Sequence, residues 1–308
     1  LIRDKHDLEE LCDLSVRALD EIIDYQEYPI LAAKQSAQSR RSLGIGYIGL
    51  AHYLAKNHVA YGDKEALELV DETTEAFQYY LLKASNQLAI EKGQCEYFEK
   101  TKYSDGILPI DTYKKDIDKI VKRKLSYDWK QLRKDIQEHG LRHSTLSAQM
   151  PSESSSVVSN ATNGIEPPRD YLSVKKSKKG TLKQIVPDYY RLKNFYTLLW
   201  DMPSNEGYIN VVATMQKYFD QAISGNWSYN PQNYKDGEVP ISVMANDLLT
   251  TYKLGWKTSY YQNTYDAKTD LDEPAHPVGW HDNQKEMKSR EEFESQEDYD
   301  DYCEACMI

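Results

Sequence analysis

The hexapeptide Pro151-Ser152-Glu153-Ser154-Ser155-Ser156 is rich in hydroxyl groups and lies between two recognisable patterns. Residues 146–150, directly before it, alternate apolar and polar side chains and predict a short strand, and residues 157–159 follow at a possible helix start. This order favours an anion site, because free backbone N–H groups and the helix dipole attract negative charge. We expect only backbone contacts from Glu153, since its carboxylate would oppose an anion. Composition alone supports a serine-rich loop without a ligand equally well.

The sequence on both sides of this hexapeptide predicts a helix-rich α/β protein. Apolar residues at helical spacing predict helices near residues 8–23, 43–56, 66–88, 112–122, 129–138, 189–200, 208–224 and 240–253. Pro29 ends the first helix, and Gly93 and Gly140 close the third and the fifth. Residues 171–175 and 181–186 flank a turn and predict a hairpin, and a last strand is expected at 258–261.

The composition is that of an ordinary soluble globular protein and excludes several classes of function. The 308 residues are 40% hydrophobic and 28% charged, with a formal net charge of −11, and this length suits two domains or one large α/β domain. We expect no direct nucleic-acid binding, because duplex-binding proteins normally present a basic face. No apolar run approaches the roughly 20 residues that span a bilayer. Four cysteines and no recognisable signal peptide suit the reducing cytoplasm.

Two patterns resemble functional motifs but are better explained by structure. The run 44–49 has the glycine spacing of a dinucleotide-binding loop, yet the polar residues 33–42 before it show no strand pattern. We therefore expect these glycines to serve helix packing. His139 and His143 have the spacing of a helical metal pair, but Gly140 lies between them and no acidic third ligand is suitably placed. We expect structural histidines and no metal site.

Two residue pairs near the end of the chain are candidates for redox chemistry. Tyr260 and Tyr261 are adjacent at the end of the last expected strand, where they are either packing residues or a relay for an electron and a proton. Cys303 and Cys306 follow an acidic run, 282–301, with nine acidic and three basic residues, which predicts a flexible tail. Two further zinc ligands are missing nearby, so a mobile dithiol that exchanges with another disulfide fits better.

These features occur together, in the same order, in one known family. The matching segments are Gly106-Ile-Leu-Pro-Ile-Asp-Thr-Tyr-Lys-Lys115, the hexapeptide 151–156, Ser159-Asn-Ala-Thr-Asn-Gly-Ile-Glu-Pro-Pro-Arg169, Tyr260-Tyr-Gln-Asn-Thr264 and the terminal cysteine pair. From Leu8 to the last residue, the chain resembles the carboxyl-terminal portion of the large (alpha) subunit of class I, aerobic Ia-like, ribonucleoside-diphosphate reductases. The hexapeptide and the segment after it are highly specific for that family.

The resemblance implies a fold, a reaction and a role for each matching residue. Residues 1–280 would form the carboxyl-terminal part of a ten-stranded α/β barrel, and residues 281–308 a flexible acidic redox tail. Ribonucleoside diphosphates would be reduced to deoxyribonucleoside diphosphates by thiyl-radical chemistry. Pro151–Ser156 would hold the substrate diphosphate, and Tyr260 and Tyr261 would relay the radical. Cys303 and Cys306 would reduce the active-site disulfide and be recharged by thioredoxin or glutaredoxin.

Two departures from the family pattern bear on how the chain could work. The family's tail usually has a wider gap between its two cysteines than the two residues found here. The Asn-x-Cys-x-Glu motif of the radical cysteine does not occur, and Cys12 and Cys95 stand in other contexts, so we expect both to be structural. The chemistry would then need a partner chain, the amino-terminal piece of the large subunit, which would also carry the radical cysteine and the nucleotide-effector sites.

Further partners and alternatives follow from the same resemblance. The small subunit would supply the metal-radical cofactor, and no cofactor would bind directly to this chain. A natural split gene and a shortened one-chain enzyme predict the same chemistry. The alternative from another class is a non-catalytic docking module derived from a reductase large subunit, although decay would have eroded the loop, the tyrosine pair and the tail independently. An autonomous thiol oxidoreductase is less consistent, because no thioredoxin-like strand precedes Cys303.

Overall fold

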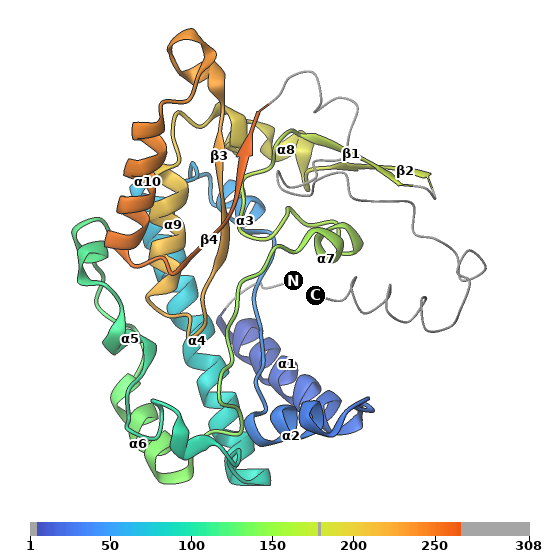
Figure 1. The fold of residues 1–308 in the computed structure, drawn as a ribbon, viewed down its shortest axis with the longest axis vertical. Helices are drawn as coiled ribbons and strands as arrows, with labels where there is room; N and C mark the ends of the chain where they lie inside the picture. The colour runs from blue at the N-terminus through green and yellow to red at the C-terminus, as the bar shows by residue number, and fades with distance from the viewer. Residues whose placement is uncertain (1–4, 178–179, 266–308) are drawn as a thin grey trace, which may run out of the picture. The chain divides into compact units, whose positions relative to one another are not determined.

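The computed structural model describes residues 5–177 and 180–265, all within one unit of the chain, Leu1–Pro274. This part is helix-rich with a few short strands (Figure 1). The helices are α1 (Lys5–Tyr25), α2 (Leu31–Arg40), α3 (Leu50–Lys56), α4 (Lys64–Lys92), α5 (Pro109–Thr112), α6 (Trp129–His139), α7 (Glu153–Val158), α8 (Tyr189–Leu192), α9 (Glu206–Gln216) and α10 (Ile241–Leu254). The strands are β1 (Leu172–Ser177), β2 (Gly180–Ile185), β3 (Ser224–Tyr229) and β4 (Thr258–Thr264). None of the described helices is long and apolar enough to cross a membrane.

The long helix α4 is the centre of the core. It packs against α1, α6 and α9, and most of its apolar side chains are buried, with Val70, Leu81 and Leu88 completely so. Helix α4 ends where the sequence predicts, at Gly93, whose φ of 86° is a conformation that glycine adopts most readily. The core is therefore built on a helix that contacts other elements on most of its sides.

Four extended segments run parallel to one another and form an open sheet. The segment around Ile45 pairs with Ser147, Gln149 pairs with Ile223 just before β3, and β3 pairs with β4, each time in parallel. Parallel neighbours need long crossover connections, which the intervening helices supply. We call residues 43–46, residues 146–150, β3 and β4 the four-segment sheet. Because all four segments point the same way, their starts lie at one end of the sheet and their ends at the other.

The prediction of a helix over 43–56 is wrong in its first half. Leu43 and Ile45 donate backbone hydrogen bonds to Thr145 and Leu146, and the helix begins only at Leu50. Gly46 serves this strand pairing and not helix packing, since a Cβ there would overlap the carbonyl oxygen of Ala148. The segment before the glycines is helix α2, which the sequence did not reveal. In the described residues, the segment before the glycines of 44–49 is therefore a helix and not the buried strand that a dinucleotide-binding loop requires.

Other elements divide into confirmed and corrected predictions. The helices α1, α4, α6 and α10, the β1–β2 hairpin and the strand β4 are confirmed. The helices expected over 112–122 and 189–200 are replaced by short α-helical and 3-10 turns. The helix expected over 208–224 ends at Gln216, and β3 begins at Ser224. The helix-rich mixed α/β class is confirmed, but the sheet of the described residues is open, and no closed barrel is formed among them.

Candidate functional site

The loop predicted to bind an anion lies directly after the second segment of the four-segment sheet. Helix α7 starts at Glu153, and its first backbone hydrogen bond runs from the amide of Ser156 to the carbonyl of Ser152, at 2.8 Å. The amides of residues 153–155 therefore precede the first helical hydrogen bond and are available to a ligand. A loop that follows the end of a parallel strand is also where α/β sheets place their ligand sites.

The serines of this loop have two different roles. Ser152 and Ser156 are buried, and their hydroxyls donate to the carbonyls of Met150 and Glu153, at 3.1 and 3.0 Å. Ser154 and Ser155 are exposed, as is the side chain of Glu153. The buried pair fixes the shape of the loop, and the exposed pair can supply hydroxyls to an anion together with the free amides. Sequence alone did not separate these two roles.

Tyr260 and Tyr261 of β4 contact each other through both their rings and their hydroxyls. The Tyr261 hydroxyl donates to that of Tyr260 at 3.2 Å, and the ring centroids are 4.0 Å apart. Tyr260 is 50% exposed and Tyr261 is partly buried. The hydrogen bond to Tyr260 is the main cause that raises the pKa of Tyr261. Two phenols whose hydroxyls are hydrogen-bonded can exchange a hydrogen atom. Tyrosines that only pack against each other would not need this hydrogen bond.

One asparagine links the tyrosine strand to the segment that follows the loop. Asn226 lies on β3 beside a register shift, where its Oδ1 accepts from the amide of Tyr261 at 3.2 Å. Its Nδ2 donates to Glu166 at 2.6 Å, and Asn163 donates to the same carboxylate at 3.4 Å. The family-like segment 159–169 and β4 are thereby held in one hydrogen-bonded network. The sequence analysis assigned no role to Asn226 or Glu166.

The pKa of the Glu166 carboxyl group is influenced by the charge of Glu153 in the loop. Burial raises its pKa, the hydrogen bond from Asn226 and the charge of Arg169 lower it, and the charge of Glu153 raises it. Glu153 at the start of α7 therefore lies within electrostatic range of Glu166. The amide of Ala161 also donates to the carbonyl of Ser156 at 2.8 Å, so the hexapeptide loop, the segment 159–169 and the tyrosine strand are connected by hydrogen bonds.

The cysteines and histidines give no second reactive centre among the described residues. Burial raises the pKa of Cys12 to about 12 and also raises that of Cys95, so both thiols stay protonated and suit the expected structural role. His143 is buried with its Nδ1 2.9 Å from the hydroxyl of Ser85. No metal-binding group of three or more His, Cys, Asp or Glu residues occurs in the described ranges. Cys303 and Cys306 lie outside the described residues.

Comparison with known proteins identifies the family. The family model described as "Ribonucleotide reductase, barrel domain" matches residues 2–262, and the chain belongs to this family. The ribonucleoside-diphosphate reductase subunit alpha of Haemophilus influenzae is 60% identical over 259 residues, which are 84% of this chain and 34% of that protein. Subunit alpha of reductase 1 of Escherichia coli is 57% identical over 255 residues, 83% of this chain and 34% of that protein.

A viral relative matches the same extent of the chain. The subunit alpha of Enterobacteria phage T4 is 46% identical over 267 residues, 86% of this chain and 35% of that protein. The chain therefore spans about a third of the length of the curated relatives it matches, and the matching region is their carboxyl-terminal part.

Proposed function

We propose that this chain supplies the substrate-side portion of a ribonucleoside-diphosphate reductase large subunit, which reduces ribonucleoside diphosphates to deoxyribonucleoside diphosphates. The hexapeptide loop Pro151–Ser156 binds the substrate diphosphate through the free amides at the start of α7 and the exposed hydroxyls of Ser154 and Ser155. The observation that carries the proposal is the hydrogen-bonded network that joins the segment 159–169 to Tyr261 and Tyr260, together with the backbone hydrogen bond from the amide of Ala161 to the carbonyl of Ser156 at the loop.

The tyrosine pair relays the radical in this proposal. A phenoxyl radical on one ring takes a hydrogen atom from the hydroxyl of the other, so the electron and the proton move together and no charge builds up. The 3.2 Å separation of the two oxygens suits such a transfer. The radical then passes from Tyr260 to a cysteine of the amino-terminal portion of the large subunit, which lies outside this sequence because the radical-cysteine motif does not occur in it.

Cys303 and Cys306 restore the enzyme after each turnover in this proposal. Reduction of one ribose oxidises two active-site thiols to a disulfide and releases one water. The dithiol of the tail, residues 281–308, reduces that disulfide by thiol exchange and becomes a disulfide itself. Thioredoxin or glutaredoxin returns it to the dithiol form. Residues 1–280 then form the carboxyl-terminal part of the ten-stranded α/β barrel.

The remaining parts of the reductase come from other polypeptides. The amino-terminal piece of the large subunit supplies the missing strands, the radical cysteine and the effector sites, and the small subunit carries the metal-radical cofactor. The open four-segment sheet supports this assembly, because unpaired strand edges need a partner. The assembly works in the cytoplasm. The test is formation of deoxycytidine diphosphate from cytidine diphosphate by this chain with the amino-terminal piece, the small subunit and thioredoxin.

The expected result is product formation that requires every polypeptide of the mixture. Omission of this chain should remove activity, as should omission of the amino-terminal piece. An inactive mixture of folded and complete components would instead favour the docking module, in which the chain binds the small subunit without taking part in the reaction.

A further inference from the structure

A large cavity lies at the starts of the four-segment sheet, at the opposite end from the hexapeptide loop. It has a volume of about 610 Å³, within the range of pockets for organic ligands. The residues just before each segment line it: Ser42 before the first, Ser144 and Thr145 before the second, Phe219 and Asp220 before β3, and Trp256 and Lys257 before β4. The hexapeptide loop follows the end of the second segment, so the loop and the cavity are at opposite ends of the sheet.

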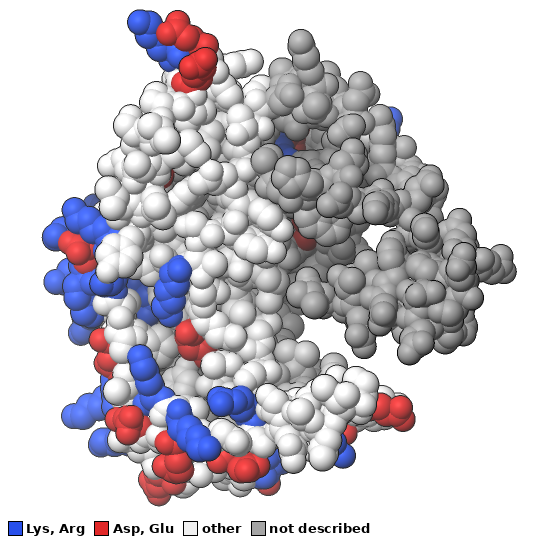
Figure 2. All heavy atoms as spheres, in the orientation of Figure 1, with Lys and Arg blue, Asp and Glu red and all other residues white. Residues whose placement is uncertain are grey.

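Five cationic side chains line this cavity, which is unusual in a chain whose net charge is −11. They come from separate elements and are Arg40, Lys100, Lys102, Lys114 and Lys257. Lysine and arginine side chains also gather beside α5 and the carboxyl-terminal end of α10 in Figure 2. No ion pair between any of these five cations and a described acidic residue is formed. Their charges are therefore available to an anion.

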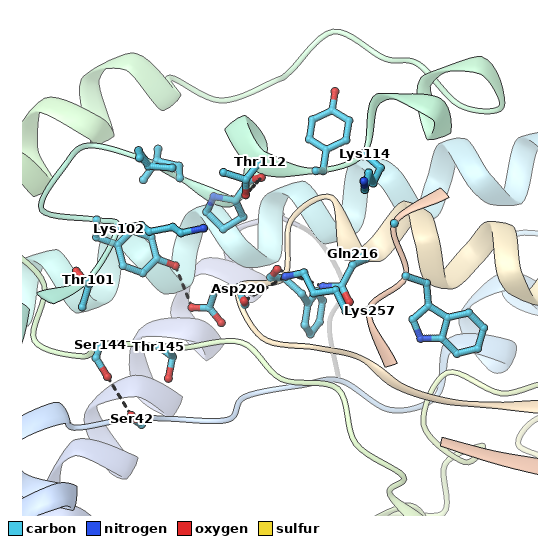
Figure 3. A pocket seen from close by; sticks show the side chains of 18 of the residues that line it. Ser42, Thr101, Lys102, Thr112, Lys114, Ser144, Thr145, Gln216, Asp220 and Lys257 are labelled. Carbon is cyan, nitrogen blue, oxygen red and sulfur yellow. Dashed lines mark hydrogen bonds between the residues drawn. The ribbon is translucent and has the colours of Figure 1, made fainter. Parts of the chain in front are cut away.

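Lys102 and Lys257 extend toward each other from opposite walls of the cavity (Figure 3). Burial lowers the pKa of Lys257 most, the charge of Asp220 raises it, and the neighbouring charge of Lys102 lowers it again. Among the described residues, Lys257 donates to the backbone carbonyl of Asp220, at 3.4 Å. Two facing ammonium groups repel each other, and an anion between them would remove that repulsion.

The single carboxylate among the described residues that line the cavity does not neutralise it. Asp220 accepts four hydrogen bonds, from the Tyr103 hydroxyl at 2.9 Å, the amides of Leu146 and Ser147 at 2.8 and 3.1 Å, and the Ser147 hydroxyl at 3.2 Å. Both of its oxygens are thus used to hold the start of the second segment. Burial raises the pKa of this carboxyl group, and its hydrogen bonds lower it.

The cavity also has an apolar wall. Ile107 and the ring of Tyr252 line it and are 36% and 71% exposed, and Lys114 lies over the Tyr252 ring at 5.2 Å. We propose that the cavity binds a phosphate-bearing organic anion, with its phosphates between Lys102 and Lys257 and its apolar part against Tyr252 and Ile107. Such an anion fits both the charge and the volume, whereas a bare phosphate ion would leave the apolar wall unused.

The test is equilibrium dialysis of the full chain against ATP as the probe. Saturable binding is expected, displaced by inorganic tripolyphosphate and not by adenosine. Lys102→Gln and Lys257→Gln should each weaken binding about tenfold, the effect of losing one charge-assisted hydrogen bond. The side chain of Lys102 forms no hydrogen bond with another described residue, so its replacement should leave folding intact, as circular dichroism would verify. Lys183→Gln, on the β1–β2 hairpin, is the matched control and should change nothing.

Three results obtained with the unaltered protein and the lysine variants would overturn the proposal. They are absence of saturable ATP binding, equal binding by the protein that carries both lysine replacements, and displacement by adenosine alone. A loss of ATP binding in Ser155→Asp would also overturn it, because the probe would then occupy the hexapeptide loop. This proposal is independent of the reductase activity, since neither the binding measurement nor its variants involve turnover.

Discussion

The two ends of the four-segment sheet use their polar groups differently. At the starts, buried charges hold the chain in place: Asp20 contacts Arg41 and Arg142 at 2.6 and 3.2 Å, and Asp220 anchors the second segment. At the ends, the loop Pro151–Ser156 keeps free amides and exposed hydroxyls. The comparison shows that the buried ion pairs at the starts stabilise the fold, whereas the cations that line the cavity there and the polar groups at the ends remain available to ligands. Replacements at the two ends should therefore differ in kind.

The largest effect on stability is expected for Asp20→Asn, at the starts. Asp20 is completely buried, and loss of its charge removes one of the two carboxylates that pair with Arg41 and Arg142, which should cost about 3 kcal/mol of unfolding free energy. Urea unfolding of the full chain measures this. The exposed Glu68→Gln, which breaks an ion pair with Lys64, should cost less than about 1 kcal/mol. Equal losses in the two variants would contradict the comparison.

The Asp20→Asn variant also predicts how the free energy of unfolding should change with pH. Burial opposes the charge of Asp20, but hydrogen bonds with His143 and Arg41 outweigh it and lower its pKa. A lowered pKa contributes stability above the unfolded value of about 4, and that stability is lost as the pH falls through the folded value. The difference between the native protein and Asp20→Asn should therefore be largest above about pH 5 and shrink in acid. A difference that grows in acid would be inconsistent with this account.

At the ends, Ser155→Asp should impair substrate binding and spare the fold. The new carboxylate faces the site proposed for the substrate diphosphate, and like charges at an interface cost several kcal/mol. We expect KM for cytidine diphosphate to rise about a hundredfold in the reconstituted reductase. An acidic residue in the first turn suits the helix dipole, so the unfolding midpoint should not fall. Ser173→Asp on the hairpin is the control, and a KM equally raised there would refute the assignment of the loop.

A smaller effect is expected for Asn226→Ala, which removes the link between β4 and Glu166. The tyrosine strand would lose the hydrogen bond to the amide of Tyr261, so kcat should fall about tenfold while KM changes little. Asn233→Ala removes one exposed hydrogen bond, to the carbonyl of Met202, and should leave kcat unchanged. A rise in KM without a fall in kcat would show that Asn226 acts on the loop and not on the relay.

Local patterns predicted the elements whose signals are contained within a short stretch. Helix α4 ends at Gly93 and α6 at Gly140, and the hairpin folds where two short runs flank a turn. The first segment of the sheet was missed because Leu43 and Ile45 look helical by composition, and only their pairing with residues a hundred positions away makes them extended. Strand β3 was missed as well, although residues 146–150 and β4, which also pair in parallel, were predicted from their local patterns.

The residues of the candidate site were likewise predictable only where a local sequence pattern marked them. The hexapeptide loop and the tyrosine pair carry specific sequence patterns. In the structure the loop contains the start of helix α7, and the two tyrosines are joined by a hydrogen bond between their hydroxyls. Asn226 and Glu166 have no such pattern, because a lone asparagine on a strand and a glutamate in a loop are common surface residues. Their roles depend on a contact between segments 60 residues apart. Pairing of distant segments therefore limited both the fold and the site predictions.

The most direct test of the central claim is deoxycytidine diphosphate formation by Tyr261→Phe in the reconstituted reductase. The change removes one hydroxyl, whose hydrogen bond runs to Tyr260, so the fold should be preserved. Activity should fall at least about a hundredfold, as when a positioned proton-transfer group is lost. Tyr190→Phe, which removes a hydroxyl from a side chain that is 91% exposed, should keep full activity. Full activity of Tyr261→Phe would contradict the relay and, with it, the proposed part of this chain in the reaction.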